Sequence, residues 1–422
     1  MASSVWKNRN FMWLFTGRTI SQLGTSITTF SIPWLLLEIT NSATQTGIAF
    51  AIGFIPYLLF SLPAGVWADQ YNRKSLMIIA DSCRMLLLLS IPLIHLYSGE
   101  IPILLLYFVQ AGVSIFSAIF DASYGACLPN IINRSQLQEG NSALQMGFSI
   151  SRIGGPVIAG LLISIFDAAN TITLDVISYV ISILTIHFIR ASFSASVNKN
   201  TESKTDTKLL TKVREGLEYV WQIKILRTLA LFSMLVNLVG PGIDIALLFR
   251  IKNELHLASN WAGIIMAGLS CGMVVGTIAI GRIKKRFSIG LLLAISTIGQ
   301  VIPPFLLIIS QDPIVILFTQ FIVGFLLIAW NIQTVTLRQL IVPDHLLGRC
   351  TSLFRMIAWI SIPLGTTIAG VISEAFGASI YFLFAGCVLG IVCFIFISTK
   401  LYRLNEKDVE VSTIHTTSTK FN

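Results

Sequence analysis

The side chains best placed to do chemistry in this sequence are ionisable groups inside long apolar runs. Asp121, Arg152 and Asp244 are three such groups. At membrane depth an ionisable side chain costs at least about 2.5–3.5 kcal/mol on insertion scales, so its presence suggests a function. A carboxylate in a low-dielectric site can take up a proton, and a nearby arginine stabilises its charged form. These residues are the candidates for proton coupling, with Arg152 expected to pair with Asp121; the alternative is a fixed pair that only stabilises the fold.

Polar side chains, most of them uncharged, also recur at helical spacing inside four of the apolar runs, which places them on one face of each helix. In a membrane protein such a face is expected to point into the bundle or a water-filled cavity. These polar faces consist of Arg18, Gln22, Thr25 and Thr29; Tyr107, Gln110, Ser114 and Ser117; Asn237 with Asp244; and Gln320, Asn331, Thr334 and Arg338.

The elements that position these residues are membrane helices. The chain is 54% hydrophobic and only 12% charged, with a mean hydropathy of +0.79, whereas soluble domains carry about 25% charged residues. A spanning helix needs about 20 apolar residues, and about twelve runs meet this length, so we predict an all-α membrane protein. The runs are 11–39, 43–67, 75–97, 101–126, 139–165, 171–190, 225–249, 260–281, 287–310, 313–336, 349–373 and 377–399.

The two halves of the sequence resemble each other. The segment from Gly155 through Pro156 to Gly160 is repeated from Gly365 to Gly370, at an offset of 365 − 155 = 210 residues. This pattern predicts two six-helix pseudo-repeats around a central cavity. The expected divisions are an N-terminal half at 1–190, a cytoplasmic linker at 191–221 ending in a short amphipathic helix, a C-terminal half at 222–403 and a flexible tail at 404–422.

Basic residues concentrate in the loops on one side of the predicted membrane, including the linker, so both termini are expected in the cytoplasm. For the same reason the net charge of +9 does not indicate nucleic-acid binding. We expect the six cysteines to be free thiols, since no pair has the spacing of metal ligands.

The loop between the second and third runs carries a charged signature. Gly65 would let the second helix approach a neighbour closely, and Asn72 would accept the left-handed backbone of a tight turn. Asp69 could bind the N-terminus of another helix. Arg73 and Lys74 would hold the loop in the cytoplasm, although an ordinary positively charged loop explains these two equally well.

This loop resembles the signature of the major facilitator superfamily, Gly-x-x-x-Asp-Arg-x-Gly-Arg-Arg, with departures at Gln70 and Asn72. The segments 10–17 and 343–349 are most similar to the bacterial macrolide-efflux and siderophore-exporter branch. Gly155, Pro156 and Gly160 resemble the Gly-Pro-x-x-Gly-Gly motif of the exporters, which implies a pliable gate helix; plain close packing of glycines is the alternative. The family's Gly-Asp in the first helix is Gly24-Thr25 here.

The resemblance implies that helices one, four, seven and ten line a central cavity. It predicts a secondary active transporter that exports a small amphiphilic molecule, such as a macrolide or a siderophore, in exchange for protons. Arg18, Arg152, Arg338 and Arg355 outnumber Asp121 and Asp244, which favours an anionic or zwitterionic substrate. The alternatives are a metabolite importer of the same fold, or a non-transporting sensor or lipid-handling protein.

The sequence shows no phosphate-binding loop, no His-Glu-x-x-His and no nucleophile elbow, so we expect neither an enzyme nor an ATP-driven pump. No cofactor or metal is expected. The expected partners are the small-molecule substrate, protons and the lipid bilayer, without nucleic acid. We expect a monomer in the bacterial cytoplasmic (inner) membrane.

Overall fold

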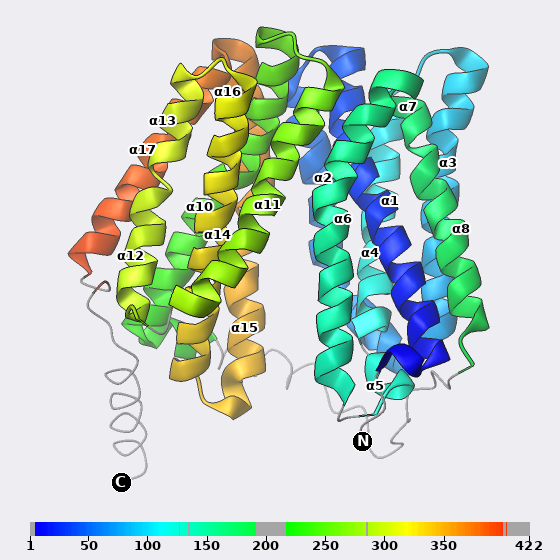
Figure 1. Ribbon diagram of the computed structural model, residues 1–422, viewed down its shortest axis with the longest axis horizontal. Coiled ribbons are helices and arrows are strands. Elements are labelled where there is room, and N and C mark those ends of the chain that lie inside the picture. Colours follow the sequence, from blue (N-terminus) through cyan, green and yellow to red (C-terminus); the bar gives the residue numbers. More distant parts are fainter. Residues whose placement is uncertain are drawn as a thin grey trace. The chain divides into compact units, whose positions relative to one another are not determined.

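The computed structural model describes residues 5–125, 127–133, 136–190, 217–283, 286–399 and 402. All regular elements in these ranges are helices, as predicted (Figure 1). They fall into two compact units, one of residues 1–200 with 248–267 and one of residues 201–247 with 268–422. The predicted flexible tail, and the linker apart from residues 217–221, lie outside the described residues.

Unit 1 contains the helices from the N-terminal part of the chain. They are α1 (Arg9–Thr40), α2 (Ala43–Gln70), α3 (Arg73–Ser98), α4 (Ile103–Gly125), α5 (Leu128–Ile131), α6 (Leu137–Phe166), α7 (Ala168–Thr171) and α8 (Thr173–Phe188), after a 3-10 turn at Val5–Lys7.

Unit 2 contains most of the remaining helices. They are α10 (Lys224–Phe249), α11 (Ser259–Ile283), α12 (Ile289–Gly299), α13 (Ile302–Ile309), α14 (Pro313–Ile341), α15 (Asp344–Trp359), α16 (Ile362–Phe376) and α17 (Ala378–Ser398). The end of α10, the π-helical turn Arg250–Glu254 and the start of α11 belong to unit 1.

The described helices match the predicted apolar runs to within a few residues at most boundaries. Eleven of the described helical segments are long and apolar enough to cross a membrane. The first helix, α1, is 32 residues long, but polar side chains lower its hydropathy. Two predicted runs are each formed by a pair of helices, α12 with α13 and α15 with α16. The chain is therefore a polytopic all-α membrane protein.

The turn between α2 and α3 is formed differently from the prediction. Asn72 has φ −66° and ψ 113°, an extended backbone rather than a left-handed one. Its side-chain oxygen accepts hydrogen bonds from the backbone N–H groups of Lys74 at 2.9 Å and Ser75 at 3.4 Å. Asn72 is thus the N-cap of α3, a role that asparagine fills as well as any residue.

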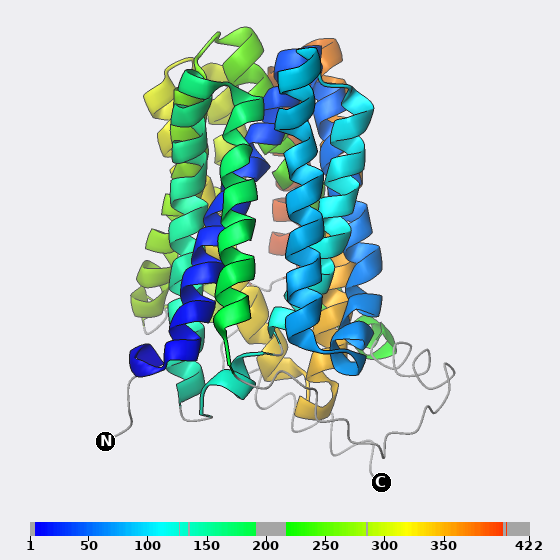
Figure 2. The same ribbon diagram turned by 90° about the vertical axis from the view of Figure 1, so that its right-hand side faces the viewer.

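Within unit 1, small residues let α1 pack closely on its neighbours. A Cβ atom at Gly24 would collide with Ser178 and Asp175 of α8, and one at Gly155 of α6 would collide with Ser26 of α1. Figure 2 shows α1 running beside α6 and α8. Close backbone approach through glycine is typical of packed membrane helices.

Unit 2 repeats one of these contacts. A Cβ atom at Gly365 of α16 would collide with the backbone of Leu238 in α10. Gly155 and Gly365 are the equivalent residues of the sequence repeat, and each lies against the first spanning helix of its own half. Their matching environments support the pseudo-repeat inferred from the offset of 210 residues.

Candidate substrate-binding pockets

Asp121 is held by two other helices of unit 1. Its Oδ1 accepts a hydrogen bond from Nη2 of Arg18 at 2.9 Å, and Oδ2 accepts one from the Tyr57 hydroxyl at 3.2 Å. The Arg18 guanidinium also lies over the rings of Phe120 and Tyr124, at 5.0 and 4.7 Å. The prediction of an Asp121–Arg152 pair missed this partner, because the long arginine of α1 reaches α4 across the bundle.

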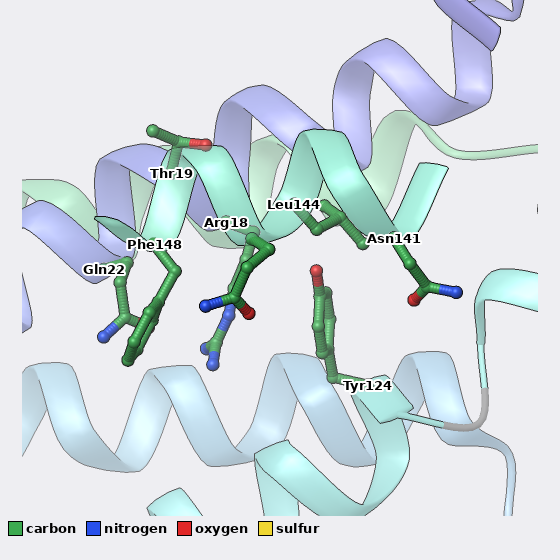
Figure 3. A pocket seen from close by; sticks show the side chains of 8 residues that line it. Arg18, Thr19, Gln22, Tyr124, Asn141, Leu144 and Phe148 are labelled. Carbon is green, nitrogen blue, oxygen red and sulfur yellow. The ribbon is translucent and has the colours of Figure 1, made fainter. Parts of the chain in front are cut away.

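Arg18 lines a pocket of about 250 Å³ within unit 1, which we call the first-unit pocket. Figure 3 shows the side chains of Arg18, Gln22, Tyr124 and Phe148 gathered around it. Amide and guanidinium groups alternate with aromatic rings, a composition suited to an amphiphilic molecule. The full lining is Arg18, Thr19, Gln22, Tyr124, Asn141, Leu144, Gln145 and Phe148.

The remaining polar residues of α1 lie outside the lining of this pocket. The Thr25 hydroxyl lies 3.3 Å from that of Tyr179, and Thr29 donates to the carbonyl of Thr25 at 2.7 Å. Thr25 therefore contacts α8, whereas Thr29 is exposed and bonds within its own helix.

Most of the predicted polar face of α4 is also used for packing. Tyr107 donates to the carbonyl of Gln45 at 3.3 Å, and Gln110 lies against Gly53 of α2. Ser114 is buried, and Ser117 accepts a hydrogen bond from Arg84 at 3.5 Å. The pitch of the helix was predicted correctly, but helical spacing cannot reveal which neighbour covers a polar face.

Sequence reasoning missed the contribution of α6 to the pocket lining, because it considered this helix only as a gate and as the position of Arg152. Asn141, Gln145 and Phe148 of this helix line the first-unit pocket, as does Tyr124 of α4. A signal was present, since Asn141, Gln145 and Arg152 are spaced by four and seven residues on one helical face. The Arg152 guanidinium lies 5.8 Å from the centre of the Phe148 ring.

A buried polar cluster connects α3 to α8. Asp81 and Arg84 form an ion pair, and Ser182 donates to Asp81 at 2.6 Å. Arg84 lies 4.5 and 4.7 Å from the ring centres of Phe120 and Tyr179. Asp175 is 1% exposed and accepts a hydrogen bond from Ser178 at 2.9 Å. Full burial with several partners indicates a structural role for this cluster.

Unit 2 contains its own pocket of about 240 Å³, which we call the second-unit pocket. Five of its residues are equivalent to lining residues of the first-unit pocket, at the offset 334 − 124 = 210. The equivalent pairs are Tyr124 with Thr334, Asn141 with Thr351, Leu144 with Phe354, Gln145 with Arg355, and Phe148 with Ala358.

Four of the predicted residues of the C-terminal half meet at the second-unit pocket together with Arg355: Asn237, Asn331, Thr334 and Arg338. Asn237 also donates to the carbonyl of Ala358 at 3.0 Å. Gln320 does not belong to the lining. It is fully buried beside Gly268 of α11, more than two helical turns from Asn331. Asp244 is half-buried on α10, close enough to Tyr381 to act on it electrostatically.

The loop between α2 and α3 forms several local contacts. Arg73 donates to the carbonyl of Ala68 at 3.0 Å and pairs with Asp69 at 3.3 Å. Lys74 donates to the carbonyls of His187 and Ile189, at 2.7 and 2.8 Å, at the C-terminal end of α8. A Cβ atom at Gly65 would meet no described atom within 4 Å, so the expected close approach at this glycine is not observed.

The glycines of α6 pack tightly. Gly160 lies against Gly263 at the start of α11, and the Ser259 hydroxyl donates to the Gly160 carbonyl at 2.9 Å. A Cβ atom at Gly263 would collide with the carbonyl of Pro156. Close packing against α11 therefore explains why residue 160 is a glycine. A gating role for α6 stays a prediction.

The whole chain matches a known family. The family described as "Transmembrane secretion effector" matches residues 2–421. The chain belongs to this family of major facilitator transporters. It is therefore a membrane transporter with a small-molecule substrate, and not an enzyme.

Curated relatives of this transporter include named efflux proteins. The multidrug efflux pump Tap of Mycolicibacterium fortuitum is 26% identical, over 85% of this chain and 88% of its own. The macrolide efflux protein A of Streptococcus pyogenes is 25% identical, over 96% of this chain and 98% of its own. The predicted resemblance to bacterial macrolide-efflux transporters is thereby confirmed.

Solved structures share the fold at lower identity. The nucleoside transporter NupG superposes with a TM-score of 0.76 at 14% identity, covering 94% of this chain and all of that one. A bacterial homologue of the iron transporter ferroportin gives 0.76 at 16% identity, covering 95% of this chain and all of that one. At these identities the likeness establishes the fold alone.

Proposed function

We propose that this transporter exports a small amphiphilic molecule in exchange for protons, by alternating access. Export is supported by the efflux proteins among its relatives, which cover nearly the whole chain. Amphiphilic cargo is supported by the mixture of aromatic, amide and guanidinium groups in both pockets. We further propose a monomer in the bacterial inner membrane with both termini in the cytoplasm, because the basic loops favour that orientation.

The observation that carries proton coupling is the Arg18–Asp121 pair. Arg18 lines the first-unit pocket, and its partner Asp121 is 39% exposed at the side chain. Protonation of Asp121 would remove the charge that holds the guanidinium, and would leave Arg18 free to reorient in the pocket. Proton uptake and substrate binding are thus linked through one side chain. Arg152 and Asp244 remain the secondary candidates for this role.

The test uses Asp121→Asn, which keeps the size of the side chain and removes its charge. In proteoliposomes with an imposed pH gradient, uphill transport of a labelled amphiphilic substrate, whether a macrolide or an organic acid, should be lost, because the amide cannot take up the coupling proton. Downhill exchange of the same substrate should continue. Glu100→Gln, an exposed carboxylate in the loop after α3, is the matched control.

Full gradient-driven transport by Asp121→Asn would remove this residue from the mechanism. Failure of the variant to fold would show instead that the Arg18–Asp121 pair is needed for the stability of the protein. The direction of transport separates export from the alternative, because an importer would accumulate substrate on the cytoplasmic side under the same gradient.

A further inference from the structure

The two pockets differ in how their arginines are neutralised. In the first-unit pocket Arg18 is paired with a carboxylate, Asp121, at 2.9 Å. The second-unit pocket is lined by two arginines, Arg338 of α14 and Arg355 of α15. Within the part of the chain that the structure describes, neither forms an ion pair with a carboxylate. Two positive charges therefore share one pocket without an acidic partner among the described residues.

The contacts of these arginines leave their hydrogen-bond donors available. The Arg338 guanidinium lies 4.7 Å from the centre of the Phe354 ring, and that of Arg355 lies 5.2 Å from Trp359. A contact between a guanidinium group and a ring does not satisfy the five N–H donors of arginine by hydrogen bonding. Arg338 is only 8% exposed, and its Nε has no hydrogen-bond partner among the described residues.

A third donor faces the same pocket. The Thr334 hydroxyl, one helical turn before Arg338 on α14, is buried and also lacks a partner among the described residues. A buried charge without a counter-ion is unfavourable, as is a buried polar group without a hydrogen bond. Arg338 and Arg355 are also close enough for their charges to repel each other. An anion bound between them would relieve all three penalties.

We propose that the second-unit pocket binds the anionic group of an amphiphilic organic substrate, with Arg338 and Arg355 holding the anion. The guanidinium fork matches the two oxygens of a carboxylate and also fits a sulfonate. Trp330, Phe354 and Trp359 supply an aromatic wall for the apolar part of the same molecule. The proposal rests on the proposed transport function, and it narrows the substrate class to aromatic or apolar organic acids.

The test measures equilibrium binding of three probes that share one fluorophore. Dansylglycine carries a carboxylate, dansylglycinamide is its neutral isostere, and dansylcadaverine is a cation. The full-length protein in phosphatidylcholine nanodiscs is titrated with each probe and followed by fluorescence. We expect dansylglycine to bind most tightly and to lose affinity as salt is added, because its charge is paired with arginine.

The decisive variants are Arg338→Gln and Arg355→Gln. Each should weaken dansylglycine binding about ten- to hundredfold, the range expected for a lost charge-assisted hydrogen bond. Binding of dansylglycinamide should change little, which also shows that the pocket is still folded. Since Arg355 is exposed, its variant is informative even where the buried Arg338 is needed for folding. The control is Arg282→Gln, which removes an exposed charge on α11 outside the pocket.

The outcomes separate this proposal from the transport function. Unchanged dansylglycine affinity in both variants, or equal affinity for the amide, would overturn the anion site even if export is observed. Carboxylate preference without any transport would support the site and contradict the function. A lipid phosphate is the other source of an anion, so the titration is repeated with phosphatidylglycerol in the nanodisc. Loss of dansylglycine binding there would assign the pocket to lipid and overturn the substrate proposal.

Discussion

Two aspartates of unit 1, Asp81 and Asp121, have different surroundings, and we infer different roles for them. Asp81 is fully buried, with Arg84 and Ser182 as its partners, whereas the side chain of Asp121 is 39% exposed and pairs with Arg18, which lines a pocket. If one member of a buried pair loses its charge, the other is left as an uncompensated buried charge, which is strongly destabilising. A partly exposed carboxylate is accessible to water, which can supply or accept a proton. The sequence shows both as aspartates in apolar runs, and only their surroundings distinguish them.

The buried pair leads to a prediction about stability. Arg84→Met should lower the free energy of unfolding by about 3–5 kcal/mol, because Asp81 would be left buried without its cation. Replacing both residues, as Asp81→Leu with Arg84→Met, should restore much of this loss. Thermal unfolding followed by tryptophan fluorescence would measure the effect.

Arg18→Met provides the comparison for that experiment. Its pair with Asp121 is partly exposed, so we expect a loss of about 1 kcal/mol or less. If Arg18→Met and Arg84→Met destabilise the protein equally, the distinction between a structural Asp81–Arg84 pair and a functional Arg18–Asp121 pair is wrong.

At the scale of elements, glycines of this chain differ in how closely other helices pack against them. Gly24 is enclosed between α1 and α8, while a side chain at Gly65 on α2 would meet nothing among the described residues. Gly24→Ala should therefore destabilise the protein by about 1–3 kcal/mol through overpacking. Gly65→Ala should stay within about 0.5 kcal/mol of the native protein. The same unfolding assay measures both, and a larger effect at Gly65 would show an undetected contact there.

The loop that follows α2 supports a prediction about gating. Asp69 is exposed and pairs only loosely with Arg73, at 3.3 Å. We propose that it binds the N-terminus of another helix when the cytoplasmic side closes. Such a contact contributes about 0.3–1 kcal/mol, or up to ~2 when partly buried, enough to shift a two-state equilibrium several-fold.

Asp69→Asn should accordingly reduce the transport rate several-fold while membrane insertion is unchanged. The rate is measured in proteoliposomes at matched protein content. Asp312→Asn, at the exposed N-cap of α14, serves as a control for the loss of a carboxylate at a loop. A normal rate in the Asp69 variant would exclude this residue from gating.

At the scale of the whole molecule, two units of related sequence carry related pockets. The equivalence of five lining positions explains why polar residues recur in both halves of the chain. The pockets nevertheless differ in charge, since Gln145 of one corresponds to Arg355 of the other. A duplicated scaffold can thus keep its helix packing while each half acquires its own binding chemistry.

The orientation of the chain can be tested with single cysteines in a background without the native thiols. A cysteine at Glu100 should react with a membrane-impermeant maleimide added to whole cells, because the loop after α3 is expected outside. Glu100 is preferable to the adjacent Gly99, whose φ of 71° favours glycine. A cysteine at Ser203, outside the described residues, should react only after the cells are opened. The reverse labelling pattern would show that the chain has the opposite orientation in the membrane.

Sequence alone determined the features that depend on local pattern. Apolar run length predicted the spanning helices, because a helix must satisfy its own backbone hydrogen bonds in lipid. The repeat offset predicted equivalent halves, and the loop motif predicted the family. Helical spacing also identified Arg18, Gln22, Asn331, Thr334 and Arg338, which all line pockets.

Tertiary structure alone decided which polar groups meet. Arg18 and Asp121 are 103 residues apart, and no spacing rule connects helices that are distant in sequence. For the same reason Tyr107 and Gln320 looked like cavity residues but are used in packing, while Tyr124 and Asn141 were missed. A side chain on a polar helical face can point to a pocket or to a neighbouring helix, and only the packing of the bundle selects between them.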